Sequence, residues 1–237
     1  MGSDKEKLVW NMGKRSIGII DTSITLAGKG TDMSSQMVIL HGYTENSIVR
    51  KMVGCSNSNR VCILEISDTE DKNFTEINCF DIDIRRTVFS KKLGSDDPQG
   101  VNRYTKSIEL SVNEEFIFSV GVFIDSIGGE NCLVQKGFIN AMKLNATLKE
   151  AASIVIDEAS HADKKGMYRV NRMANSDTLI LSSWVDVFVY RFDCKANIFS
   201  HMHSFISLHS NLIYNVICTT EGFFTCSNDC ENTFIKL

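Results

Sequence analysis

The feature that most constrains the fold is a recurring pattern of strands and turns, whose two clearest copies begin at Tyr168 and Tyr214, 46 residues apart. Each copy begins Tyr-x-Val and continues through a polar turn into an apolar strand that ends at Ser. A second turn then carries an aspartate, Asp186 or Asp229, before a closing apolar strand. Recurrence at a period of about 20–50 residues is typical of folds built from stacked supersecondary units. The sequence therefore predicts β units that bury one another's apolar faces.

Looser copies of the same unit precede these two. Strand, turn and strand follow one another over residues 24–40, 49–66 and 107–134. At about 40–45 residues per unit, a chain of this length is expected to hold about five units, and fewer if its two non-repeating segments are discounted.

Strand-like runs dominate the sequence. Among them are "RVCILEI", "EFIFSVGVFI", "TLILSSW" and "VDVFVYRF", which are rich in β-branched and aromatic residues. Gly, Asn, Asp and Ser, the residues of tight turns, separate many of the runs. Several runs are apolar at nearly every position, which suits strands covered on both faces. We therefore expect an all-β fold with residues 1–237 in a single domain.

The recurring unit resembles the repeat of the WD-repeat family of β-propellers. The closest match runs from Ser227-Asn228-Asp229 through "TFIKL", followed by Ser182-Ser183 through "VFVY" and by "MVGCSNSNRVCILEI". No Gly-His pair opens a unit and no Trp-Asp pair closes one, the nearest being Trp184-Val185-Asp186.

The resemblance implies four-stranded antiparallel blades around a channel and a role in docking other proteins. Because open blades leave strand edges exposed, the chain would form either a compact propeller or part of a ring that needs more chain or a partner. The alternative fold is a β-sandwich with insertions.

Two segments interrupt the strand pattern. Residues 145–165 accumulate Ala, Glu and Lys and would form either a short helix or the strand "SIVID". We interpret this segment as a connection between repeats. Residues 91–106, which contain Pro98, are predicted to form a loop.

Composition excludes several classes of function. The net charge is −4 and charges of both signs are interspersed, whereas nucleic-acid binding normally requires a basic stripe. No apolar run approaches the roughly 20 residues of a membrane-spanning helix. Residues 1–7 are polar and charged, unlike a secretory signal. We therefore expect an intracellular protein, cytoplasmic or nuclear, without nucleic-acid or membrane partners.

The eight cysteines are dispersed and mostly lie inside strand-like runs. In a reducing compartment such residues behave as small buried apolar side chains. A zinc site would need thiolates and imidazoles close together, and one group near the C-terminus offers both. It contains His201, His203, His209, Cys218, Cys226 and Cys230. We interpret this group as buried thiols and surface histidines, and predict neither a metal nor a cofactor.

No catalytic motif is present. The sequence contains no G-x-S-x-G turn, and no cysteine is placed with a histidine as in known cysteine nucleophiles. We predict a non-enzymatic scaffold that docks a protein partner. The alternatives are a structural subunit that completes a larger complex, and an enzyme with its site in the propeller channel.

Partner contacts are expected from arginine and aromatic side chains, which dominate interaction hot spots. Loops and strand ends of a rigid scaffold present such residues to partners. The candidates are Arg50, Arg103, Tyr104, Arg169, Arg172 and Trp184. Trp184 fits core packing equally well, and the arginines also fit solvated strand ends.

Overall fold

The computed structural model describes residues 7–11, 17–21, 47–55, 58, 60–67, 75–84, 86–93, 102–126, 133–145, 147–156 and 166–237. Their regular secondary structure consists of strands. None of them forms a helix long and apolar enough to cross a membrane.

The described strands form five antiparallel sheets that follow one another in chain order. The first is a hairpin of β1 (Lys7–Asn11) and β2 (Ile17–Asp21). The second sheet contains β3 (Ser47–Gly54), β4 (Arg60–Ser67), β5 (Thr75–Asp81) and β6 (Arg86–Leu93). The third contains β7 (Asn102–Leu110), β8 (Phe116–Ser126), β9 (Leu133–Lys143) and β10 (Glu150–Ile156). The fourth contains β11 (Arg169–Arg172), β12 (Thr178–Ser182), β13 (Val187–Asp193) and β14 (Ile198–Phe205). The last contains β15 (Ile213–Cys218), β16 (Gly222–Ser227) and β17 (Asn232–Lys236).

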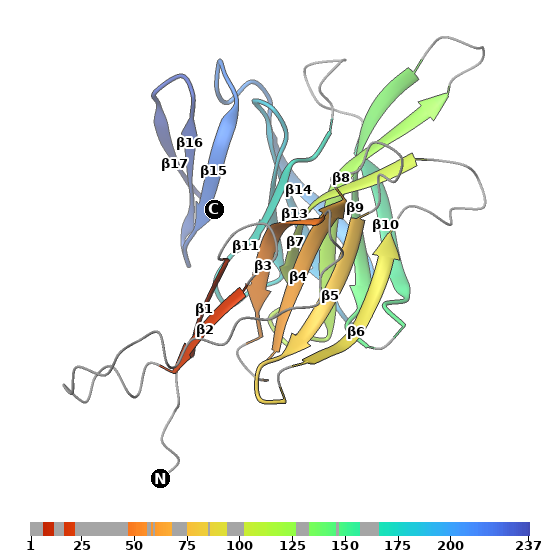
Figure 1. Ribbon diagram of the computed structural model, residues 1–237. Helices are drawn as coiled ribbons and strands as arrows, with labels where there is room; N and C mark the ends of the chain where they lie inside the picture. Colours follow the sequence, from red (N-terminus) through yellow and green to blue (C-terminus); the bar gives the residue numbers. More distant parts are fainter. Residues whose placement is uncertain are drawn as a thin grey trace, which may run out of the picture.

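The four larger sheets, from β3 to β17, are arranged as the blades of a propeller. Within each sheet, strands that are consecutive in the chain are neighbours. The first strands of successive sheets pack together: β3 against β7, β7 against β11, and β11 against β15. Figure 1 shows β3, β7 and β11 near the middle of the molecule and β6 and β10 at its margin. The fold is therefore an all-β, propeller-like array of antiparallel blades, and more than two sheets stack in series, unlike a β-sandwich.

The sequence recurrence corresponds to this stacking. The copy that begins at Tyr168 becomes β11 to β13, and the copy that begins at Tyr214 becomes β15 to β17. Residues 107–134 and 49–66 also coincide with consecutive strands of single sheets. The copy at residues 24–40 lies outside the described residues.

Apolar clusters fill the space between neighbouring blades. Between the blades of β7–β10 and β11–β14, the rings of Phe116 and Phe118 contact Phe192, with ring centroids 5.1 and 5.2 Å apart. Phe188 and Phe199 belong to the same cluster. Burying one such side chain stabilises a fold by about 1.5–3 kcal/mol. The apolar faces of adjacent blades therefore supply each other's cover.

Similar clusters lie on either side of this one. Cys62, Leu64 and Ile77 pack against Ile108 and Ile117 between the blades of β3–β6 and β7–β10. Val187, Val189, Ile213 and Phe223 pack between the last two blades. An inner blade is therefore covered on both faces, which explains why all five residues of β12 are buried.

The structures predicted for the two segments that interrupt the strand pattern, residues 145–165 and 91–106, were wrong in part. Glu150–Ile156 is strand β10, which pairs with β9 at the edge of its blade, so it is part of a repeat instead of a connection between repeats. The predicted loop at residues 91–106 begins inside β6 and ends inside β7. Both errors concern strands that contain polar residues: β10 and β6 at the edges of their blades, and β7 at the start of its blade. A neighbouring strand supplies hydrogen bonds to such residues whatever their intrinsic strand propensity.

Candidate functional site

The first strands of four blades line a cavity of about 570 Å³. This volume lies in the range of about 300–1,000 Å³ that is common for ligand sites. The lining residues are Val49, Arg50, Lys51, Lys106, Ser107, Tyr168, Arg169, Asn171, Trp184, Leu212, Ile213 and Asn215. They come from β3, β7, β11 and β15, from the residue before β11, from the β12–β13 turn, which carries Trp184, and from the end of the β14–β15 connection, which carries Leu212. The cavity therefore lies where the blades meet.

Positive charge is concentrated in this cavity. Arg50 of β3, Lys106 of β7 and Arg169 of β11 all line it, together with Lys51. None of the described lining residues is an aspartate or a glutamate. The protein as a whole carries a net charge of −4, so the cavity is opposite in sign to the average of the chain.

The cations of the cavity interact with one another. Burial lowers the pKa of Lys106 from its ordinary value, and the nearby charge of Arg50 lowers it further. Partial burial and the charge of Arg50 also lower the pKa of Arg169. Like charges that share a site disfavour the charged form of each group. An anion in the cavity would remove this repulsion.

One of the four cations is already neutralised. Lys51 Nζ lies 3.6 Å from Glu109 Oε2 and donates a hydrogen bond of 2.6 Å to the carbonyl of Val170. Burial lowers the pKa of Lys51, and the carboxylate of Glu109 opposes this effect. Arg50 and Arg169 form no ion pair with a carboxylate among the described residues. They are therefore the cations that remain for a ligand, together with Lys106.

Lys106 has an aromatic neighbour. Its Nζ lies 5.9 Å from the ring centroid of Tyr104, within the range of a cation–π contact. Such a contact holds the ammonium in place without cancelling its charge.

Trp184 is fixed at the cavity by the aspartate turn that follows β12. The amide of Ser183 donates to the carbonyl of Asp186 at 3.0 Å, and its hydroxyl donates to Asp186 Oδ2 at 3.2 Å. Asp186 Oδ1 accepts a bond of 2.7 Å from the amide of Ser207, and the carbonyl of Trp184 accepts one of 2.8 Å from Ile213. The turn is thus tied to both sides of the β14–β15 connection. This rigidity holds the half-buried indole at the cavity.

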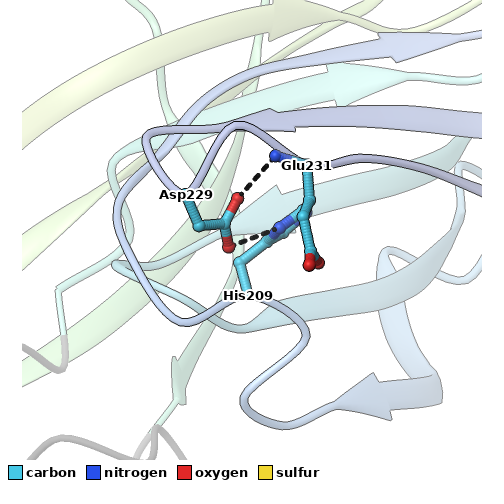
Figure 2. A group of neighbouring side chains, drawn as sticks. All are labelled: His209, Asp229 and Glu231. Atoms are coloured by element: carbon cyan, nitrogen blue, oxygen red, sulfur yellow. Dashed lines mark hydrogen bonds and ion pairs between the residues drawn. The ribbon is translucent and has the colours of Figure 1, made fainter.

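The second aspartate turn holds the same connection from the other blade. Asp229 Oδ2 accepts a bond of 2.9 Å from the amide of Ser210 and lies 3.1 Å from His209 Nδ1. Asp229 Oδ1 accepts a bond of 3.0 Å from the amide of Glu231, as Figure 2 shows. Burial raises the pKa of Asp229, but the amide bonds from Glu231 and Ser210 outweigh it, and the pKa falls to about 2.

His209 links this turn to the core of the last blade. Its side chain is fully buried, and its Nε2 lies 2.7 Å from the hydroxyl of Thr225 on β16. The amide of His209 also donates to the carbonyl of Val185 at 3.3 Å. One residue of the β14–β15 connection therefore bonds to both adjacent blades.

His209, Asp229 and Glu231 are also the one trio of metal-ligand side chains that the described residues bring together, with ligand atoms within 4.8 Å of one another. Both imidazole nitrogens of His209 already have partners, and both carboxylate oxygens of Asp229 accept amide hydrogen bonds. A cation would have to displace these bonds. The arrangement therefore fits a structural hydrogen-bond network better than a metal centre.

The cysteine and histidine group does not converge. His201 and His203 are exposed on β14, where the His201 ring lies 5.2 Å from that of Tyr190. Cys230 is exposed at the β16–β17 turn, and Cys226 is half-buried on β16. The prediction of surface histidines is correct for these two and wrong for His209, which is buried.

The prediction of buried thiols is correct for Cys62 and Cys79. It is wrong for the three cysteines of the group near the C-terminus, because Cys218 and Cys226 are half-buried and Cys230 is exposed. Cys62 and Cys79 are fully buried opposite each other on β4 and β5. Burial and the Asp177 carboxylate raise the pKa of Cys194 to about 12, and burial raises that of Cys218 to about 12. Cys132 lies outside the described residues.

Only some of the predicted docking residues lie at the cavity. Arg50, Arg169 and Trp184 line the cavity. Tyr104 contacts Lys106 beside it, and the side chain of Arg103 lies outside the described residues. Arg172 donates from Nε to the carbonyl of Leu110 at 2.7 Å and from an Nη to that of Met173 at 3.1 Å, so it joins two blades.

The sequence prediction missed Lys106 and Lys51. Both lie on first strands of blades, but Lys106 falls inside the segment predicted as a loop. The signal that could have found them is a basic residue in the first strand of each of three blades, with Arg50 in β3, Lys106 in β7 and Arg169 in β11.

No protein-family model matches the chain, and no curated protein matches it at a significant level. Solved structures do match. Hydrazine synthase of Kuenenia stuttgartiensis aligns over 94% of this chain and 65% of its own, with a TM-score of 0.65 and 11% identity. A functionally unknown protein from Desulfotomaculum acetoxidans DSM 771 aligns over 96% of this chain and 64% of its own, with a TM-score of 0.55 and 12% identity.

A third match is Sqt1 of Chaetomium thermophilum bound to the N-terminus of ribosomal protein L10. It aligns over 95% of this chain and 66% of its own, with a TM-score of 0.48 and 11% identity. This chain spans less than two thirds of the length of each of the three. At these identities the first two likenesses show the fold alone.

Proposed function

We propose that the protein is a non-enzymatic scaffold of WD-repeat type that docks a protein partner at the cavity where the blades meet. The observation that carries the proposal is a concave site lined by Arg50, Lys106, Arg169 and Trp184 on rigid strands and a fixed turn. Arginine and tryptophan are the side chains that contribute most at protein interfaces. The proposed partner would insert one segment into this cavity.

The chemistry of the lining supports binding over catalysis. No histidine, cysteine, aspartate or glutamate is among the described lining residues. General acid–base and nucleophilic catalysis usually rely on such groups. The channel-enzyme alternative therefore has less support at this site.

The WD-repeat type is supported by the matching aspartate turns. Asp186 and Asp229 lie at corresponding turns of consecutive blades, and each accepts a hydrogen bond from the β14–β15 connection, through Ser207 and Ser210. We propose that this shared turn chemistry reflects descent from a common repeat.

The experiment is a comparison of captured proteins. Tagged wild-type protein and the variants Arg169→Ala and Trp184→Ala are used to purify partners from native extract. Arg191→Ala, which replaces an exposed residue of β13 outside the cavity, is the matched control. The proposal expects a set of proteins that bind the wild type and the control but not the cavity variants. Equal recovery by all four proteins, each shown to be folded, would contradict docking at the cavity.

A second candidate, a structural subunit of a larger complex, is favoured by the outer blade. Ile217, Phe224 and Phe234 lie side by side across β15, β16 and β17, and are 53, 43 and 44% exposed. Apolar rows of this kind mark contact surfaces. This candidate is tested by light scattering after size exclusion of the wild type and of a Phe224→Ser, Phe234→Ser double variant. It requires a molar mass above that of one chain for the wild type and the molar mass of one chain for the variant.

A further inference from the structure

We propose that the cavity receives a phosphorylated side chain of the partner segment. This inference rests on the proposed docking function and deepens it by naming the chemistry that the cavity recognises.

The charge balance favours a group with more than one negative charge. Three cations, Arg50, Lys106 and Arg169, line the cavity without a described carboxylate to pair with, whereas Lys51 already has Glu109. A carboxylate carries a single charge, whereas a phosphoryl group carries about −1.5 to −2 at neutral pH and offers three acceptor oxygens. The phosphoryl group therefore matches the lining better than an aspartate or glutamate does.

The types and positions of the cations suit the same group. Arginine presents a planar fork of donors that binds phosphate and carboxylate oxygens in pairs, and lysine adds a point charge. Arg50, Lys106 and Arg169 come from three different strands, β3, β7 and β11, which pack side by side. Arg50 and Lys106 lie at β-bulges between paired residues of β3 and β7, and Arg169 pairs with Ser182. All three cations are therefore carried by strands that are fixed in their sheets.

The neutral part of the lining suits a peptide. Trp184 offers an apolar surface, and Asn171 and Asn215 offer amide donors and acceptors of the kind that bind peptide backbone. A nucleic acid would instead need a basic stripe that follows several consecutive phosphates. Here Arg50, Lys106 and Arg169 line one cavity of about 570 Å³, which has room for one phosphoryl group and the peptide residues beside it.

The test uses the full chain and three immobilised peptide libraries with random flanking residues. The libraries differ at one fixed central residue, which is phosphoserine, serine or glutamate. The inference expects retention on the phosphoserine library at least about 10-fold above the serine library, with glutamate well below phosphoserine. Retention should fall as salt rises from about 50 to about 300 mM, and inorganic phosphate should compete.

Variants locate the binding. Arg50→Ala and Arg169→Ala each replace an exposed side chain, and each should weaken retention by about 10-fold or more, as expected for the loss of a charge-assisted contact. Arg191→Ala removes the same charge outside the cavity and should bind like the wild type. Equal retention on the serine and phosphoserine libraries would overturn the inference. So would retention of the phosphoserine library that survives both cavity variants.

Two further results separate this inference from the docking proposal. If partners captured from extract still bind after phosphatase treatment, and are still lost with Arg169→Ala, docking at the cavity stands and the phosphate inference is wrong. If a labelled oligothymidylate binds more tightly than the phosphoserine library and depends on the same arginines, the ligand is a nucleic acid and the peptide inference is overturned.

Discussion

Replacing His209 with alanine should destabilise the junction between the last two blades. The imidazole is fully buried and bridges the Asp229 carboxylate, 3.1 Å from Nδ1, and the Thr225 hydroxyl, 2.7 Å from Nε2. The variant removes both bonds at once. It also leaves an empty space where the ring was.

The magnitude follows from the partner that stays buried. Thr225 is fully buried, and its remaining hydrogen bond, to the carbonyl of Thr233, is long at 3.4 Å. Leaving a buried polar group without a good partner costs about 1–3 kcal/mol. Loss of packing around the missing ring adds about 1 kcal/mol. We therefore expect His209→Ala to lower the free energy of unfolding by about 2–4 kcal/mol.

The assay is thermal unfolding followed by circular dichroism, with His203→Ala as the control. For a chain of about this length, each kcal/mol corresponds to about 2–4 °C, so the midpoint should fall by about 5–15 °C. His203 is exposed on β14, and its replacement should change the free energy of unfolding by less than about 0.5 kcal/mol. Identical midpoints for the two variants would refute the structural role given to His209.

Three further predictions concern acid stability, the link between blades and the thiols. The pKa of Asp229 is depressed to about 2 in the folded protein and is about 3.9 in the unfolded chain. The stability that the ionised carboxylate contributes is therefore complete above about pH 3.9 and is lost as the pH falls towards 2. The melting point of Asp229→Asn should accordingly depend less on pH between about 2 and 4 than that of the wild type. Arg172→Ala should lower the free energy of unfolding by about 1–2 kcal/mol in urea titrations, since it removes the hydrogen bond to Leu110 that joins two blades and a second bond to Met173, and no change would count against that link. In the folded protein, Cys230 should react with a thiol reagent before Cys62 and Cys79, which should react only on unfolding, as peptide mapping of the labelled sites would reveal.

The propeller-like fold could be predicted because its signal is repeated. Apolar runs such as "TLILSSW" have no polar face, and a strand of that kind needs cover on both sides. Stacked blades provide this cover for β12, whose five residues are all buried. Strand β10 was harder to predict, because at the edge of its blade the sequence "EAASIVI" alternates in burial and includes residues that also favour helices.

The candidate site was only partly predictable. Arg50, Arg169 and Trp184 could be named from residue type alone, but their convergence depends on strands more than 100 residues apart in sequence. Lys106 was missed because a run with glycine, proline and lysine looks like a loop until a neighbouring strand pairs with it. His209 gave no sequence signal beyond its type, since its two partners, Asp229 and Thr225, follow it by 20 and 16 residues.

The central claim, that a protein partner docks where the blades meet, can be tested most directly by site-specific photocrosslinking. A benzoylphenylalanine is introduced in place of Trp184 at the cavity or, as the control, in place of Ile198, which is 56% exposed on β14 away from the cavity lining. The account predicts that proteins captured from extract crosslink from position 184 and not from position 198. Crosslinks from position 198 with none from position 184 would contradict it.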